Sequence, residues 1–218
     1  MNKRDLIEIA RGWKHVFRRY FKIISYINVH PSALLGLNNH IDNPSNLYMA
    51  EQSSLKRDNV IMNGRAKFML KKWSGAAEEL MVITGNHMSI VGLDVKHVTD
   101  EVKDIQDVHG EYDRDVIVDE DVWMGARVSL LSGVHIGRGA EIGTGAVVRG
   151  SIPPYAVVIG NPAKVVGFRF TPEEIIEHEK ILYPESERLP LELLEKNYKK
   201  YFLDHIKEIK AYTGLICK

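Results

Sequence analysis

The chain has 218 residues, enough to bury a sizeable core as one domain or two small ones. Its 29 basic and 29 acidic residues cancel, so no overall field favours nucleic acid or an anionic membrane, and small molecules are the expected partners. The single cysteine, Cys217, excludes an intrachain disulfide framework, and no apolar stretch suits a signal peptide or a membrane span. We therefore expect a cytoplasmic protein with no membrane span.

The first 26 residues favour an amphipathic helix. Between about residues 3 and 26, apolar side chains recur at helical spacing and basic side chains lie between them. The apolar positions are Leu6, Ile9, Trp13, Val16, Phe17, Tyr20 and Ile24. We expect this helix to pack on the main domain with its basic side in water. The alternative is a basic surface that attracts polyanionic carbohydrate or anionic lipid.

Residues 27 to 86 carry a weak six-residue spacing. Short apolar runs at 29–33, 47–50 and 67–70 alternate with polar corners, as expected for strands of early coils that carry insertions. Residues 88 to 114 then interrupt the pattern with a polar segment that contains His and Asp. A long excursion inside a compact repeat is usually functional or disordered, and we expect an active-site loop here.

A clean hexapeptide repeat follows this loop. Two series of apolar residues, each at six-residue spacing, run together through the next part of the chain. They are Val118, Met124, Leu130, Ile136, Ile142 and Val148, and Val122, Val128, Val134, Ala140, Ala146 and Ile152. A period of six fits neither an amphipathic helix nor a half-buried strand, but it is typical of short strands joined by tight corners in a parallel β-helix. Three faces predict eighteen residues per coil.

The C-terminal part, residues 171–218, is predicted to be helical. Residues 171–174, Thr-Pro-Glu-Glu, supply a capping residue, a proline for the first helical position and the glutamate of a capping box, so a helix should run to about Leu182. Two prolines separate it from a second predicted helix over about residues 191–212. These helices are expected to cover the open end of the repeat, because an uncovered coil is an exposed sheet edge.

Four short motifs in sequence order are specific in combination: D-V-W-x-G at 121–125, G-V-x-I-G at 133–137, I-P-P-Y at 152–155 and G-N-P-A-K at 160–164. With them, the chain resembles the hexapeptide-repeat acyltransferases, in the branch of sugar and capsule O-acetyltransferases and streptogramin acetyltransferases. The resemblance implies an all-β core, a left-handed parallel β-helix over residues 27–170, that moves acetyl groups from acetyl-CoA. It also implies a homotrimer with active sites between subunits.

Acetyl transfer to an alcohol needs a base, and His is the side chain whose usual pKa suits that role at neutral pH. In the family resembled, the catalytic His occupies the place of His87, after Asn86, where the last early coil meets the loop. His97 and His109 lie in the loop and are expected to contact the acceptor, together with Asn86. His135 lies within the regular repeat, where an exterior coil residue is the simpler interpretation.

The resemblance also implies a groove for acetyl-CoA. Trp123 would lie by the acyl site and the pantetheine arm, although an aromatic ring packed on the coil exterior is the alternative. Small corner residues would let the arm approach the backbone; they are Gly125, Ala126, Thr144 and Gly145. Arg149 and Lys164 are the candidate phosphate ligands, with solvated surface charges as the alternative. Asn161 and Pro162 are expected to shape the turn that closes the groove.

Other chemistries fit less well. His87, His97 and His109 do not have the spacing of the three-His hydratases related to this family, so no metal is expected. No Ser-His-Asp or Cys-His order is evident, which favours direct acetyl transfer in a ternary complex. We expect an O-acetyltransferase for a sugar hydroxyl of a small-molecule or oligosaccharide acceptor, in surface-polysaccharide or capsule biosynthesis. The alternatives are a nucleotide-amino-sugar N-acetyltransferase, a streptogramin-type antibiotic acetyltransferase, and a non-enzymatic β-helix scaffold.

Overall fold

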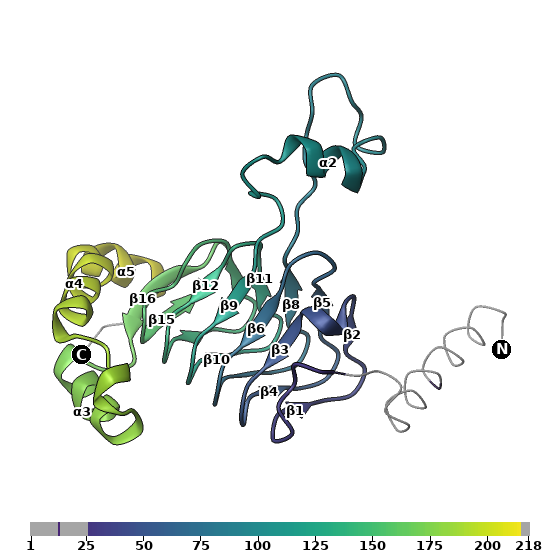
Figure 1. Ribbon diagram of the computed structural model, residues 1–218. Coiled ribbons are helices and arrows are strands. Elements are labelled where there is room, and N and C mark those ends of the chain that lie inside the picture. The colour runs from purple at the N-terminus through teal and green to yellow at the C-terminus, as the bar shows by residue number, and fades with distance from the viewer. Residues whose placement is uncertain (1–12, 14–25, 215–218) are drawn as a thin grey trace, which may run out of the picture.

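Three sheets form the body of the molecule in the computed structural model, which describes Trp13 and residues 26–214 (Figure 1). The predicted N-terminal helix and Cys217 therefore lie outside the described residues, apart from Trp13 and Tyr26. Within the described ranges, no helix has the length and the apolar composition that crossing a membrane requires.

The strands are short and run mostly parallel. The first sheet contains β1 (Leu34–Leu35), β4 (Ser54–Leu55), β7 (Gly75–Ala76), β10 (Trp123–Met124), β13 (Glu141–Ile142), β15 (Ala156–Ile159) and the antiparallel β16 (Lys164–Phe168). The second contains β2 (His40–Ile41), β5 (Val60–Met62), β8 (Met81–Ile83), β11 (Ser129–Leu130) and β14 (Val147–Val148). The third contains β3 (Leu47–Met49), β6 (Phe68–Leu70), β9 (Val116–Val118) and β12 (His135–Ile136). From β1 to β14, consecutive strands visit the three sheets in turn, which makes a three-sided coil.

The strand register confirms the predicted coil length. In the regular part, Trp123 pairs with Glu141 and Ser129 pairs with Val147, in each case eighteen residues along. All twelve apolar positions of the hexapeptide series are buried and belong to one core cluster. Burying a side chain such as Leu130 or Ile136 stabilises the fold by about 1.5–3 kcal/mol each, so the repeat itself supplies the core of the coil.

The early coils are longer, as expected, and their corners hold buried asparagines. Leu34 pairs with Ser54 and Ser54 with Gly75, so these coils have two or three residues more than the regular ones. The Asn59 amide group donates to Asn39 Oδ1 (2.9 Å), and the Leu80 backbone amide donates to Asn59 Oδ1 (2.7 Å). This stack of side-chain hydrogen bonds satisfies buried polar groups at positions that apolar residues hold in later coils. The six-residue signal is therefore weak here.

A long loop interrupts the coil between β8 and β9 and projects away from it (Figure 1). Its two ends are held together like a hairpin: Gly85 and Asp113 form an antiparallel bridge, and the Asn86 amide donates to the Tyr112 carbonyl (2.8 Å). The loop carries a short helix, α2 (Asp100–Gln106), which is capped by Thr99 and which the sequence pattern did not predict. The loop base thus has a fixed geometry directly beside His87.

The C-terminal helices lie at the far end of the coil (Figure 1). The first, α3 (Pro172–Leu182), confirms the predicted helix and its capping box. The prediction of one continuous second helix is wrong, because the chain forms α4 (Leu191–Tyr201) and α5 (Ile206–Thr213), separated by the 3₁₀ turn η3 (Leu203–His205). The backbone leaves the helical region at Phe202 (φ −122°, ψ −63°), whose ring packs 5.2 Å from Tyr198. Two more 3₁₀ turns, η1 (Pro44–Asn46) and η2 (Glu185–Glu187), lie in connections.

A buried ion pair joins α3 to the coil. Glu179 is fully buried and accepts hydrogen bonds from the Tyr155 hydroxyl (3.0 Å), from Arg138 (3.3 Å) and from the Leu189 amide (2.6 Å). The Arg138 guanidinium also lies 4.0 Å from the centre of the Tyr183 ring. Burial, reinforced by the Glu179 carboxylate, raises the pKa of Tyr155, so its hydroxyl remains a donor. We call these four side chains, Arg138, Tyr155, Glu179 and Tyr183, the α3 clamp.

Candidate functional site

His87 lines a cavity of about 220 Å³ at the base of the loop, which we call the loop-base cavity. The end of β8, the neighbouring early corner and α2 supply its walls; they include Met62, Arg65, Ile83, Asn86, Asp100 and Lys103. His87 is exposed, and no hydrogen bond joins its imidazole to another described residue. An imidazole in this state can accept a proton from a ligand that enters the cavity.

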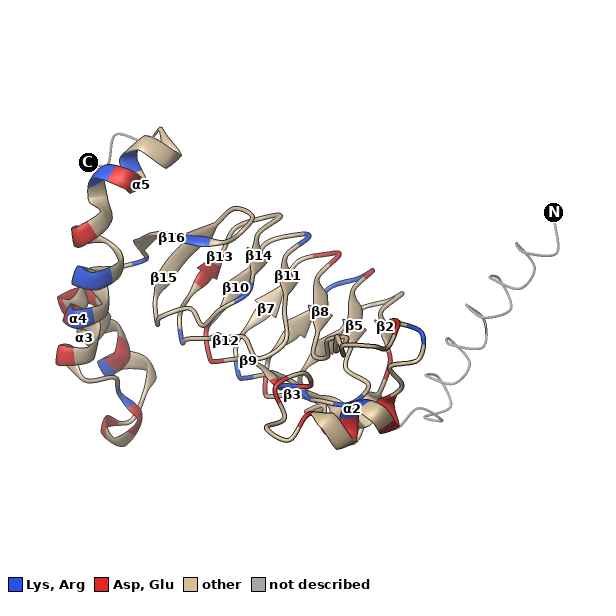
Figure 2. Ribbon diagram, turned by 90° about the horizontal axis from the view of Figure 1, so that it is seen from above, with Lys and Arg blue, Asp and Glu red and all other residues tan. Residues whose placement is uncertain are grey.

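Charged residues tie α2 to the base of the loop and so fix the walls of the loop-base cavity. The sequence analysis did not assign these residues to the site. Lys103 on α2 is buried, and its Nζ donates to Asp113 (2.8 Å) and to the Asn86 carbonyl (3.4 Å). Asp113 also accepts from Arg65 (2.7 Å), which in turn pairs with Asp104. These hydrogen bonds raise the pKa of Arg65. The helix therefore carries both signs of charge (Figure 2) and is tied to the residue that precedes His87.

The other candidate histidines lie elsewhere. His97 does not line the loop-base cavity; its Nδ1 lies 2.8 Å from Asp94 at the exposed tip of the loop, and this hydrogen bond lowers the pKa of Asp94. His109 is exposed and does not line it either. His135 is on the coil exterior, with Nε2 2.8 Å from Asp119. The structure thus brings Asn86 together with His87, but not His97 or His109.

The small residues expected at the cofactor groove share one corner of the coil. Gly125 and Ala126 follow β10, and Thr144 and Gly145 follow β13 on the next coil, where the Gly145 amide donates to the Ala126 carbonyl (2.9 Å). A Cβ on Gly125 would lie 2.7 Å from the Thr144 backbone nitrogen, so only glycine fits between these coils. We call this stack of corners the corner column.

The turn at residues 160–163 extends the corner column by one level. The Val147 amide donates to the Gly160 carbonyl (3.0 Å), and the Ala163 amide donates to the Val147 carbonyl (2.9 Å). Asn161 and Pro162 are exposed at the tip of this turn and are joined by a cis peptide bond. The column therefore presents main-chain groups over three successive levels.

Trp123 and His87 lie at different corners of the same chain. Trp123 opens β10 in the first sheet, and its indole is 48% exposed and packs on the outside of the coil against Gly75, where a Cβ would meet the ring at 3.3 Å. His87 follows β8 of the second sheet. Trp123 lines neither the loop-base cavity nor the larger cavity described next. Within one chain, the two residues are not brought into one site.

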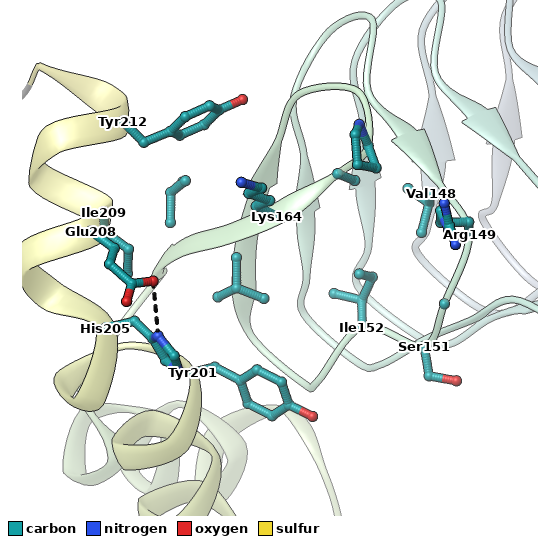
Figure 3. Close-up of a pocket in the computed structure, with 15 residues that line it drawn as sticks. Val148, Arg149, Ser151, Ile152, Lys164, Tyr201, His205, Glu208, Ile209 and Tyr212 are labelled. Carbon is teal, nitrogen blue, oxygen red and sulfur yellow. Dashed lines mark hydrogen bonds and ion pairs between the residues drawn. The ribbon is translucent and has the colours of Figure 1, made fainter.

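A second cavity, of about 560 Å³, lies between the last coil and α5 (Figure 3). We call it the terminal cavity. Arg149 and Lys164 line it together with Pro162 and with apolar groups of the coil. Residues of the C-terminal helices, which the sequence analysis did not assign to any site, form the opposite wall: Tyr201, His205, Glu208, Ile209 and Tyr212. Their only sequence signal is helical spacing, which does not distinguish a cavity wall from a packed face.

In the described part of the chain, no group of three or more His, Cys, Asp or Glu side chains is arranged to hold a metal ion.

Comparison with known proteins gives short matches in sequence. No protein-family model matches the chain. A chloramphenicol acetyltransferase of Escherichia coli is 44% identical over 61 residues, which are 28% of this chain and 29% of that protein. A probable macrolide acetyltransferase of Lysinibacillus sphaericus is 33% identical over 102 residues, 47% of this chain and 54% of that protein. The matches thus span less than two thirds of these relatives' own lengths.

Solved structures match over more of the chain. An N-acyltransferase of Bacillus cereus, AntD, in complex with dTDP and coenzyme A, has a TM-score of 0.56 at 16% identity and covers 76% of this chain and 95% of its own. A maltose O-acetyltransferase of Clostridium difficile has a TM-score of 0.52 at 24% identity, covering 63% and 67%. A hexapeptide-repeat acetyltransferase of Vibrio cholerae, complexed with acetyl coenzyme A, has a TM-score of 0.52 at 18% identity, covering 62% and 67%. The chain therefore has the fold of the hexapeptide-repeat acetyltransferases and matches acetyltransferases in segments of its sequence.

Proposed function

We propose that the protein is an acetyl-CoA-dependent O-acetyltransferase that acts on a sugar hydroxyl in surface-polysaccharide or capsule biosynthesis in the cytoplasm. The observation that carries the proposal is His87: an exposed imidazole without a side-chain partner among the described residues, at a cavity beside a rigid loop base. We further propose that the coil is left-handed, that the β-helix domain spans residues 27–170, and that residues 171–218 form a C-terminal helical extension.

His87 would act as the general base. It takes the proton of the acceptor hydroxyl as the oxygen attacks the thioester carbonyl, and CoA leaves as the thiolate after the tetrahedral intermediate collapses. Backbone amides near Trp123 would stabilise the oxyanion of that intermediate. Asn86 would contact the acceptor. The loop residues His97 and His109 would also contact it once the acceptor is bound. No covalent acyl-enzyme is needed.

Acetyl-CoA would lie along the corner column. Its pantetheine arm would run past the exposed backbone at Gly125, Ala126, Thr144 and Gly145, and its phosphates would meet Arg149 and Lys164 beyond the turn at Asn161 and Pro162. Two features support this path. Glycine at position 125 brings two coils close together, and the column leads to a cavity lined by both cations.

A homotrimer would complete the site. Because His87 and Trp123 lie at different corners of one chain, both can act on one substrate only if neighbouring chains contribute them. Light scattering should give about three times the 24.8 kDa chain mass. Mixing His87→Ala with Trp123→Ala chains, each inactive alone, should restore part of the activity under conditions of subunit exchange. A fully active monomer would overturn the shared site.

A second acceptor class is an antibiotic hydroxyl. The chloramphenicol acetyltransferase of E. coli and the probable macrolide acetyltransferase match segments of this chain at 44% and 33% identity. Such acceptors would use the same base and cofactor path. N-acetylation of a nucleotide-linked amino sugar is a third possibility, since AntD is an N-acyltransferase in complex with dTDP.

One assay tests the activity and ranks the acceptors. The purified protein is incubated with acetyl-CoA and a panel of monosaccharides, capsular oligosaccharides, nucleotide-linked amino sugars and antibiotics, and the products are identified by mass spectrometry. We expect a mass increase of one acetyl group on a sugar with a free hydroxyl, and none with His87→Ala. If no acceptor of any class becomes acetylated and no acetyl-CoA is consumed, the protein is a non-enzymatic β-helix scaffold instead.

A further inference from the structure

The imidazole of His87 lines the loop-base cavity without a side-chain partner among the described residues, so its position depends on the backbone that carries it. That backbone is held on both sides of Asn86. The Asn86 amide donates to the Tyr112 carbonyl (2.8 Å), and the Asn86 carbonyl accepts from Lys103 Nζ (3.4 Å). This carbonyl belongs to the planar peptide group that joins Asn86 to His87. The Lys103 contact therefore constrains the direction in which the chain enters His87.

Lys103 is a buried cation whose own position is fixed. It is only 8% exposed, which is unusual for a lysine. Its Nζ lies 2.9 Å from Asp113 Oδ1 and 2.8 Å from Asp113 Oδ2, and Oδ2 also accepts from Arg65 Nε (2.7 Å). A buried charge is costly unless it is paired and hydrogen-bonded. The pair with Asp113 therefore holds the Lys103 side chain, and with it α2, against the base of the loop.

Asp113 lies directly on the residue that precedes Asn86. Gly85 and Asp113 form an antiparallel bridge, and a Cβ on Gly85 would lie 2.5 Å from Asp113 Oδ1. Glycine at position 85 thus lets the carboxylate approach the backbone closely. The loop in this way brings a carboxylate and a lysine, ten residues apart in sequence, back to the short segment that leads into the candidate base.

We propose that Lys103 is a positioning residue for His87. Its pair with Asp113 fixes the peptide group that enters His87, so that the imidazole faces the loop-base cavity. The inference rests on the proposed function, in which His87 is the base. Lys103 acts through the backbone of Asn86 and not by contact with the acceptor, because its ammonium group is already bound to Asp113 and to the Asn86 carbonyl. Catalysis is sensitive to such placement, since a misplacement of about 1 Å can cost about 100-fold in rate.

Steady-state kinetics of Lys103→Met tests the role, with an acceptor that the mass-spectrometric panel identifies. Methionine keeps much of the length and apolar bulk of lysine but cannot donate to the Asn86 carbonyl. We expect kcat to fall about tenfold or more, and the KM for acetyl-CoA to stay within about twofold, because the proposed cofactor path lies along the corner column. Lys103→Arg should recover most of kcat, since it keeps a cation that can pair with Asp113. Circular dichroism checks that each variant is folded.

Lys96→Met is the matched control. It makes the same change on the same loop, at an exposed position that lines neither cavity, and should leave kcat unchanged. Wild-type kcat in Lys103→Met would overturn the inference, and so would an equal loss in Lys103→Met and Lys103→Arg. A raised KM for acetyl-CoA at unchanged kcat would make Lys103 a cofactor ligand instead.

A second readout needs no acceptor. In protein with isotope-labelled histidine, the NMR signal of the His87 ring is assigned by its loss in His87→Ala. This signal should move in Lys103→Met and stay in place in Lys103→Arg and in Lys96→Met. An unmoved signal in Lys103→Met would show that the lysine does not place the ring, and would overturn the inference. If the wild type acetylates no acceptor, the proposed function fails, and the ring signal alone then decides whether Lys103 positions His87.

Discussion

The α3 clamp should be the most sensitive point of the C-terminal region. Truncating Glu179 to Ala removes the carboxylate that accepts from Arg138, Tyr155 and the Leu189 amide. The Arg138 side chain, only 12% exposed, would keep its charge with Glu120 (3.3 Å) as its remaining carboxylate partner. Removing one partner of a buried, hydrogen-bonded ion pair typically costs about 3–5 kcal/mol. We expect Glu179→Ala to lose stability in that range.

Urea unfolding followed by circular dichroism measures the loss. With a slope of about 2–3 kcal/mol per molar urea, the midpoint should fall by about 1–2.5 M at equal protein concentration. Glu177→Ala on the same helix is the control, because its side chain is 71% exposed and pairs with Lys180 at the surface; such pairs contribute less than about 1 kcal/mol. If both variants shift the midpoint equally, the buried pair does not hold α3 to the coil.

Three further predictions concern catalysis, packing and pH. His87→Ala should lower kcat about 100-fold or more and leave CoA affinity near wild type, and kcat close to wild type would remove His87 from the role of base. Gly125→Ala should destabilise the coil by about 1–3 kcal/mol, because the added Cβ would lie 2.7 Å from backbone of the next coil; Gly167→Ala, where the space is open, should have little effect in the same urea assay. Hydrogen bonds from backbone amides, the largest from Glu111, lower the pKa of Asp107, so this contact is present above the ordinary Asp pKa and is lost as pH falls through the lowered value. The Glu111 amide shift in NMR should titrate with a midpoint below about 3.9, and a higher midpoint would contradict the contact.

The regular coils could be predicted because the apolar residues that fill their core recur at a constant spacing. From Val118 to Ile152 every sixth position faces a shared interior, so the period appears directly in the sequence. In the early coils, Asn59 occupies a position equivalent to Leu80 and Val128, and its buried side chain bonds to the coils above and below. A polar residue at a core position looks like a corner in the sequence. The hexapeptide pattern is therefore weaker in the early coils, where hydrogen-bonded asparagines take positions that apolar residues hold in the later coils.

The surroundings of the candidate site were harder to predict. Lys103 reads as a solvated charge in a polar loop, and only the folded loop base shows that it is buried against Asp113. Similarly, α5 reads as the end of one long helix, and the bend at Phe202 that brings Tyr212 to the terminal cavity depends on packing with Tyr198. The first feature depends on how the loop folds back onto its own base, and the second on a local bend; neither leaves a periodic signal in the sequence.

The antiparallel strand β16 ends the coil and so fixes the coil's length. By turning back along β15, it covers the edge of the first sheet with an antiparallel strand, so that a further parallel coil cannot add its strand there. Neighbouring strands in a sheet are about 4.8 Å apart, so the span from the Trp123 coil to the turn at Pro162 is counted in whole turns. The number of coils therefore sets the distance between Trp123 and the terminal cavity. One additional eighteen-residue coil between Trp123 and Pro162 would increase that distance by about 4.8 Å. A ligand of fixed length that touches both ends would then no longer fit.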